Sequence, residues 1–254
     1  MTNSYNPIKA GFWYTFSNIL IKSIPFLTLP IFTRLLTTED FGIYNVYLSY
    51  ESIISVILGL GLAGTIRAAS VNYSNNLKNY VSSIIILQLF VSLFLFPFVI
   101  LFLRLLAKDW LIPIIVVALI LHSISSALIG VLTNAYGITG NVKSNIITSF
   151  LITILNIILS LFFIIYIFKG KRFIGRIIGT SISYFIVASI FSCIYIKKEY
   201  LNCLKDFWKY GFKLGLPLLP HLLSMIIFST ILLLLYQVNI KVDHCPRDYG
   251  PFSF

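Results

Sequence analysis

Charged residues are scarce in this chain, and long stretches contain none. Only 11% of the 254 residues are charged, whereas 58% are hydrophobic. A soluble globule of this size could not be covered with polar groups from such a composition, so an ordinary water-soluble domain is excluded. Each charge-free run reaches the roughly 20 residues that a helix needs to cross a bilayer. These runs are 79–103, 110–142, 145–168, 177–196 and 214–240.

Several kinds of chemical site are also missing. The three cysteines, Cys193, Cys203 and Cys245, are unclustered, which argues against a disulfide framework or a metal site. There is no HExxH motif, no GxSxG motif and no Gly-rich phosphate loop, so neither an enzyme nor a cofactor is expected. The net charge of +11 comes without a soluble basic module. This positive charge is therefore expected to contact an anionic membrane surface or a polyanionic cargo, and no nucleic acid partner is expected.

The apolar runs predict an all-α integral membrane protein of about seven transmembrane helices. Only helices and closed barrels satisfy every backbone group in lipid, and no run has the period-2 alternation of barrel strands. Two further runs have the required length but carry one central charge each, Lys22 and Glu51. The sequence TTED at 37–40 predicts the N-terminal cap of the second helix. The predicted spans are 10–33, 42–66, 80–103, 112–133, 144–168, 176–196 and 214–236.

The predicted organisation is a six-helix unit followed by the start of another. Residues 1–196 form the first six-helix transmembrane half in this interpretation. Residues 197–213 mix Lys with aromatic side chains, which favours an interfacial amphipathic linker over a solvated basic loop. Residues 214–236 form the seventh helix, and 237–254 an atypical C-terminal tail. Loop charges leave the orientation open, because an inside N-terminus places nine Lys or Arg on each side.

Polar groups inside the spans are the candidate substrate pathway. If the first two spans form a hairpin, Lys22 and Glu51 lie at similar depth and form either a structural ion pair or part of a transport path. Asn18 shares the helical face of Lys22, and Asn156 belongs to a polar face of the fifth span. Polar faces either bind helices together or line water. Several at once predict a hydrated central cavity.

Histidines and prolines within the spans mark further candidate positions. His122, in the fourth span, is either a packing residue or a proton carrier, and the sequence does not separate the two. His221 follows Pro217 and Pro220 in the seventh span. Together with Pro25 in the first span, these prolines predict bent helices whose freed carbonyl groups face a cavity.

Three stretches carry a family resemblance: KAGFWYTFSNILIKSIPFLTLPIFTRLLTTEDFGIYNVY at 9–47, NAYGITGNVKSN at 134–145 and FWKYGFKLGLPLLPHLLS at 207–224. They resemble the polysaccharide-repeat flippases, the Wzx-type O-antigen and capsule transporters of the MATE-like MOP superfamily. The resemblance implies a multi-pass protein of the bacterial cytoplasmic (inner) membrane with its N-terminus inside. It also implies alternating access that moves undecaprenyl-diphosphate-linked oligosaccharide to the outer leaflet. Membrane lipid, polysaccharide polymerase and glycosyltransferases are the implied partners, and Lys22 and Arg67 would offer positive charge to the diphosphate.

The family is built from two six-helix halves, whereas this chain departs from its pattern near 229–237 and stops at residue 254. We therefore expect a truncated product, with little flipping by one chain unless two associate. One alternative is another MOP-superfamily transporter, such as a multidrug/cation antiporter, although the TTEDFG turn and FWYT opening favour the polysaccharide branch. A second is a non-functional truncated fragment. A seven-span retinal protein would need a Lys in the seventh span, and 214–240 contains none.

Overall fold

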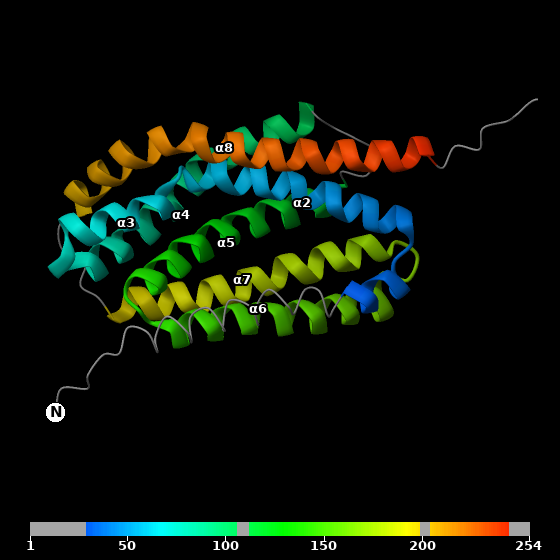
Figure 1. Ribbon diagram of the computed structural model, residues 1–254. Helices are drawn as coiled ribbons and strands as arrows, with labels where there is room; N and C mark the ends of the chain where they lie inside the picture. The colour runs from blue at the N-terminus through cyan, green and yellow to red at the C-terminus, as the bar shows by residue number, and fades with distance from the viewer. Residues whose placement is uncertain (1–28, 106–111, 199–203, 244–254) are drawn as a thin grey trace, which may run out of the picture.

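The computed structural model describes residues 29–105, 112–198 and 204–243 (Figure 1). Within these ranges the chain is helical and contains no strand, which confirms the all-α prediction. A helical segment at 29–35 precedes the labelled elements. These are α2 (Thr38–Gly59), α3 (Leu62–Asn72), the 3-10 turn η1 (Ser74–Asn76), α4 (Leu77–Leu105), α5 (Pro113–Ile138), α6 (Val142–Phe162), the π-helical turn η2 (Phe163–Ile167), α7 (Arg172–Lys198) and α8 (Leu204–Asp243).

Six helices of the described part are long and apolar enough to cross a membrane. They correspond in order to the second to seventh predicted spans. Most of the first predicted span, 10–33, lies outside the described residues. The chain is thus an all-α, multi-pass integral membrane protein, as its hydropathy pattern predicted.

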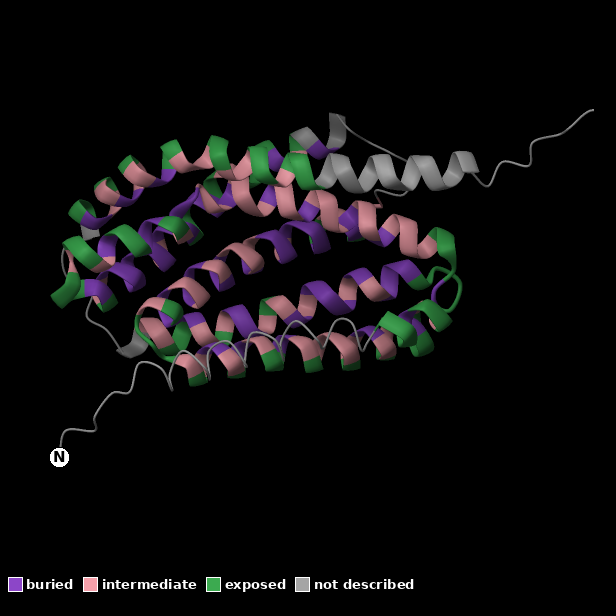
Figure 2. Ribbon diagram, viewed as in Figure 1, coloured by how far each residue is buried: buried purple, intermediate pink, exposed green. Residues whose placement is uncertain are grey.

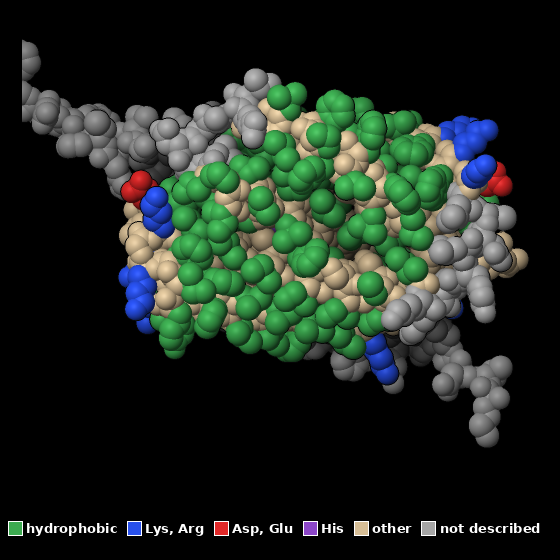
Figure 3. Space-filling model, turned by 180° about the vertical axis from the view of Figure 1, so that it is seen from behind, with side chains coloured by type: hydrophobic (Ala, Val, Ile, Leu, Met, Phe, Trp, Pro, Cys, Tyr) green, Lys and Arg blue, Asp and Glu red, His purple; other side chains and the backbone are tan. Residues whose placement is uncertain are grey.

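The outside of the bundle is an apolar belt between two charged ends. Phe94, Val117 and Phe228 are each exposed over about two thirds or more of their surface, at 71%, 67% and 70%. In Figure 3 hydrophobic side chains cover the middle of the visible face, and Lys and Arg gather at its two ends. A soluble monomer rarely exposes so large an apolar surface, whereas lipid requires it. We therefore treat the belt as the lipid-facing surface.

The described interior contains two large apolar cores, one toward each end of the bundle, and a small third cluster of Phe32, Leu36 and Ile164. Leu62, Ile84 and Leu132 belong to the core near the α3–α4 connection. Ile54 and Ile177 belong to the core nearer the opposite end. Helix α7 packs mainly against α5 and α6, and α2 mainly against α5. Figure 2 shows the buried positions on the faces that these helices turn toward one another.

The cap of α2 forms as predicted. The Thr37 hydroxyl accepts a hydrogen bond from the Asp40 amide at 3.1 Å, and the Asp40 carboxylate accepts one from the Thr37 amide at 3.2 Å. This reciprocal capping box satisfies two donors that the helix itself leaves unpaired. It fixes the turn between the helical segment 29–35 and α2, which places both beside the cavity described below.

The second predicted span is broken, contrary to the prediction of one continuous helix. Leu60 and Gly61 have φ angles of 44° and 65°, in the left-handed region, and they separate α2 from α3. The side-chain amide of Gln88 donates to the Leu58 carbonyl at 2.6 Å, which satisfies a backbone group near the break. Helix α8 crosses closely here, because a Cβ added to Gly215 would lie 2.6 Å from the Leu60 carbonyl oxygen. Glycine permits both the turn and this approach.

Helix α8 runs without interruption where the sequence predicted a linker followed by a separate span. It passes through Pro217 and Pro220 and extends seven residues beyond 236, into the predicted tail. Its first turns also differ from an interfacial helix. Phe207 is buried, and the indole of Trp208 donates to the Ser83 carbonyl at 3.1 Å. These aromatic side chains pack on α4 instead of lying on the bilayer surface.

Candidate functional site

A cavity of about 420 Å³ lies between the segment 29–36 and helices α2, α5, α6 and α7. Its apolar wall includes Leu29 and Phe32. Four helices supply polar groups to it, so the cavity joins polar faces that lie far apart in the sequence. These groups are Tyr44, Asn45 and Glu51 of α2, His122 of α5, Asn156 of α6, and Arg176, Thr180 and Tyr184 of α7.

Arg176 is the cation of this cavity. Its Nη1 donates to Oδ1 of Asn156 and to Oγ of Ser160, both at 3.0 Å. Its guanidinium carbon lies 3.6 Å from the centroid of the Phe32 ring and 5.0 Å from that of Tyr44. Guanidinium over an aromatic face is a favourable arrangement. All these partners are neutral. Glu51 also lines the cavity, and within the described residues no ion pair joins it to Arg176.

Close helix packing makes these contacts possible. A Cβ added to Gly179 would lie 2.6 Å from the Cα and amide nitrogen of Ser160, and one added to Gly175 would lie 2.9 Å from the Ile164 nitrogen. Glycines four residues apart lie on one face and allow two helices to approach backbone to backbone. This approach of α7 to α6 and η2 brings Arg176 within reach of the α6 amide and hydroxyl.

A second network lies deeper, around Tyr47, whose side chain is fully buried. Its hydroxyl is hydrogen-bonded to Nδ1 of His122 at 3.1 Å and to Oγ of Ser181 at 2.9 Å. The His122 ring also meets Tyr184 edge to face, with centroids 4.4 Å apart. The three helices α2, α5 and α7 are thus connected through one hydroxyl group. His122 has satisfied packing contacts here, while its predicted alternative role as a proton carrier stays a prediction.

Glu51 lies in the same cavity and is only 8% exposed. Its Oε1 atom has no hydrogen-bond partner among the described residues. The predicted partner, Lys22, lies outside the described part of the chain, so the proposed ion pair stays a prediction. Burial of a carboxyl oxygen without a hydrogen-bond partner costs free energy, and Glu51 is the lining residue for which this is observed.

The other residues predicted from the sequence lie partly inside and partly outside this cavity. Asn156 lines the cavity and accepts a hydrogen bond from Arg176. Arg67 is exposed on α3 and does not line this cavity, and His221 is exposed on α8. Asn18 and Pro25 lie outside the described residues. The polar face of α2 therefore continues across α5 to α7, and not to Arg67.

Arg176 was not among the residues that the sequence singled out. It directly precedes the charge-free run that starts at Ile177, so it was counted with the loop charges. A signal was present, because Arg176, Thr180 and Tyr184 recur at intervals of four residues and share one helical face. The glycine pair in Gly175–Gly179 was a second unused signal of close packing at this point.

A sequence model of the polysaccharide biosynthesis protein family matches residues 8–243. The chain belongs to this family. The matched range includes every helix of the cavity and extends beyond 229–237, where the sequence predicted a departure from the family pattern. No curated protein and no solved structure shows a significant match.

Membership of the polysaccharide biosynthesis family gives the chain a coarse function. A multi-pass membrane protein of this family takes part in polysaccharide biosynthesis or export. Within the described residues, no group of three or more His, Cys, Asp or Glu side chains is placed to hold a metal ion. The cavity lining offers one arginine, one glutamate, one histidine, hydroxyl and amide groups, and aromatic rings.

The Tyr47 network is expected to contribute to stability. Tyr47→Phe removes two buried hydrogen bonds, so the free energy of unfolding should fall by about 1–2 kcal/mol. Thermal or denaturant unfolding of the purified protein in detergent measures the change. Tyr166→Phe is the matched control, because Tyr166 is 70% exposed and the same substitution there should have no effect. Equal stability of the two variants would contradict the role assigned to Tyr47.

Proposed function

We propose that the chain exports undecaprenyl-diphosphate-linked oligosaccharide repeat units for surface polysaccharide, such as O antigen, capsule or exopolysaccharide. The site would be the cavity between α2, α5, α6 and α7, and the membrane the bacterial cytoplasmic membrane. Family membership, the membrane spans and the chemistry of the cavity all support this proposal.

The observation that carries the proposal is the arginine with only neutral partners. Arg176 projects into a cavity inside a membrane protein, where a cation is costly unless a function retains it. Guanidinium binds phosphate oxygens in a bidentate manner, and the interaction strengthens where water is excluded. A diphosphate headgroup would supply Arg176 with a direct anionic partner, which no described residue does, although Glu51 lines the same cavity.

The remaining lining suits the sugar part of such a substrate. Asn45 and Thr180 offer an amide and a hydroxyl that both donate and accept hydrogen bonds, as sugar hydroxyl groups require. Phe41 adds an aromatic ring to the lining, against which the C–H face of a pyranose would pack. Recognition by a few polar groups within an apolar wall is typical of small-molecule sites.

Alternating access is the proposed mechanism. In a MATE-like transporter, a six-helix unit rocks against a second unit around the substrate, and the cavity described above would lie within the first unit.

A liposome assay tests the proposal. A fluorescent polyprenyl-diphosphate-linked oligosaccharide is placed in both leaflets, and a membrane-impermeant reductant quenches only the outer one. In vesicles that contain the protein, the quenched fraction should rise above that of protein-free vesicles. No rise at any protein density, with the helical circular dichroism signal intact, would reject the proposal.

One observation favours a second candidate, a multidrug/cation antiporter. The unpartnered Oε1 of Glu51 could accept a cation or a proton in the same cavity. The same vesicles loaded with a fluorescent organic cation distinguish the two candidates. Cation release driven by a pH gradient, without flipping of the saccharide lipid, would replace the first proposal by the second.

A further inference from the structure

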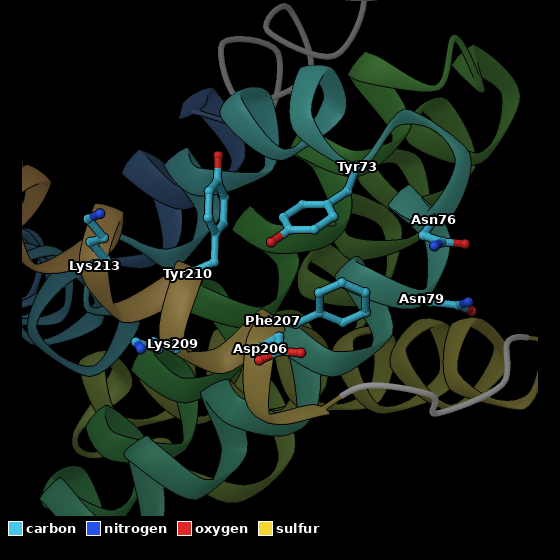
Figure 4. Close-up of a pocket in the computed structure, with 8 residues that line it drawn as sticks. All are labelled: Tyr73, Asn76, Asn79, Asp206, Phe207, Lys209, Tyr210 and Lys213. Atoms are coloured by element: carbon cyan, nitrogen blue, oxygen red, sulfur yellow. The ribbon is translucent and has the colours of Figure 1, made fainter.

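A second cavity, of about 610 Å³, opens at the α3–α4 end of the bundle. It is formed by the connection between α3 and α4 and by the first turns of α8, so it shares no lining residue with the cavity around Arg176. Figure 4 shows its three components. Lys209 and Lys213 lie on one side, Asn76 and Asn79 on the other, and aromatic rings between them.

The aromatic rings form a fixed cluster. Tyr73 meets both Phe207 and Tyr210 edge to face, each with a centroid distance of 5.2 Å, and it stacks on Tyr80 at 5.9 Å. The side-chain amide of Asn72 donates to the Tyr210 hydroxyl at 2.6 Å, which holds that ring in place. Ring orientations are thus determined by packing before any ligand arrives, and little entropy is lost when a flat molecule binds against them.

The two lysines supply positive charge at a defined depth. Lys209 and Lys213 are four residues apart on α8 and therefore share one face. Both are exposed, and within the described residues no ion pair neutralises them. Leu216, three residues further along, is already 52% exposed in the apolar belt. The lysines therefore lie at the edge of the hydrocarbon region, where lipid phosphates are found.

Asp206 makes the cavity unsuitable for a simple anion. Its carboxylate lines the same space as the lysines, and it would repel a bare phosphate. Sugar hydroxyl groups, in contrast, donate hydrogen bonds to a carboxylate and exchange them with the amides of Asn76 and Asn79. Aromatic faces, acceptor groups and two cations together match a sugar joined to a phosphate.

We propose that this cavity binds the glycosyl-phosphate headgroup of a lipid, with the sugar against Tyr73 and Tyr210 and the phosphate at Lys209 and Lys213. The inference rests on the proposed function insofar as the lipid is taken to be the lipid-linked oligosaccharide. An inside N-terminus places the α3–α4 end at the cytoplasmic face. The cavity is then a loading site, separate from the cavity around Arg176.

Binding to the full chain in phosphatidylcholine nanodiscs tests this site. The probes are a polyprenyl-diphosphate-linked disaccharide, the same polyprenyl diphosphate without sugar, and phosphatidylglycerol. Measurement in an Arg176→Gln background removes the charge of the other cavity. The double substitution Lys209→Gln and Lys213→Gln should weaken binding of the disaccharide lipid on the order of 30-fold, because each interfacial cation contributes about a factor of five. Lys205→Gln is the matched control: it removes one exposed charge one turn earlier on α8, outside the cavity.

Asp206→Asn separates the possible ligands. It should weaken binding of the disaccharide lipid severalfold, and it should leave unchanged or tighten that of the sugar-free diphosphate. Equal binding of all three probes, with no effect of Asp206→Asn, would overturn the proposal in favour of a general anionic-lipid site. An effect of the double lysine substitution no larger than that of Lys205→Gln would overturn it entirely. Sugar-dependent binding without flipping in the liposome assay would uphold this site and reject the proposed export function.

Discussion

Replacement of Arg176 by glutamine is expected to lower export about 10- to 100-fold without destabilising the protein. Hydrogen bonds to charged groups contribute about 1.5–3 kcal/mol, and about 1.4 kcal/mol corresponds to a factor of ten. Within the described residues no ion pair fixes Arg176, and a glutamine amide can still donate to Asn156 and Ser160, so folding should lose little. Removal of a costly intramembrane cation should therefore leave the unfolding temperature unchanged or raise it.

The liposome flipping assay and thermal unfolding are measured on the same preparations. Lys171→Gln is the matched control, since Lys171 is exposed near the start of α7 and loses the same charge. Arg176→Lys should retain part of the activity, because a point charge replaces the bidentate guanidinium. A loss of stability that accounts for the loss of transport would show that Arg176 is structural. Equal transport by Arg176→Gln and Lys171→Gln would contradict the assignment of the diphosphate to this residue.

Gly179→Ala is expected to destabilise the protein by about 1–3 kcal/mol, the usual range for overpacking of a close contact. The added Cβ would lie 2.6 Å from the Ser160 backbone, which has no flexible end that could move aside. Helices α6 and α7 must then separate. Since Ser160 accepts a hydrogen bond from Arg176, the separation should also displace the cation and reduce export.

Unfolding in detergent and flipping activity measure the two effects. Gly42→Ala is the control, because nothing lies within 4 Å of a Cβ added to Gly42 in α2. Alanine is the better helix former, so this variant should be as stable as the wild type or more stable. If Gly179→Ala behaved like Gly42→Ala, the close approach of α6 and α7 would not be a requirement of the fold.

Local signals predicted local structure correctly. The TTED sequence was sufficient to predict the capping box of α2, because the interaction joins residues three positions apart. The break between α2 and α3 was missed, although Gly59 and Gly61 flank Leu60. Glycines inside an apolar run do not by themselves indicate a break, because membrane helices tolerate them where a neighbouring helix approaches closely. Here that neighbour is α8, which lies more than 140 residues further along the chain.

The cavity was predictable in part. The α2 face with Glu51 and the α6 face with Asn156 were recognised from their helical spacing, and both line the cavity. The residue on α7 that joins these faces, Arg176, was not recognised. It contacts Asn156 only in the folded protein, because 20 residues and a turn separate the two in the sequence. The aromatic cover of Arg176 comes from Phe32, which lies 144 positions earlier in the sequence.

The sequence by itself determined that this is an all-α membrane protein, approximately where the second to seventh spans lie, and to which family it belongs. The spans were predictable because the cost of charge in lipid acts on each segment separately, and the family because three stretches of sequence resemble it. Only the tertiary structure decided which polar groups meet: Arg176 with Asn156, Tyr47 with His122, and the two lysines of α8 with the aromatic cluster beside α3. In lipid, the outside of a helix bundle is as apolar as its interior, so hydropathy does not mark the face on which a helix packs. Close contacts between particular side chains make that choice, and they form between segments that the sequence keeps apart.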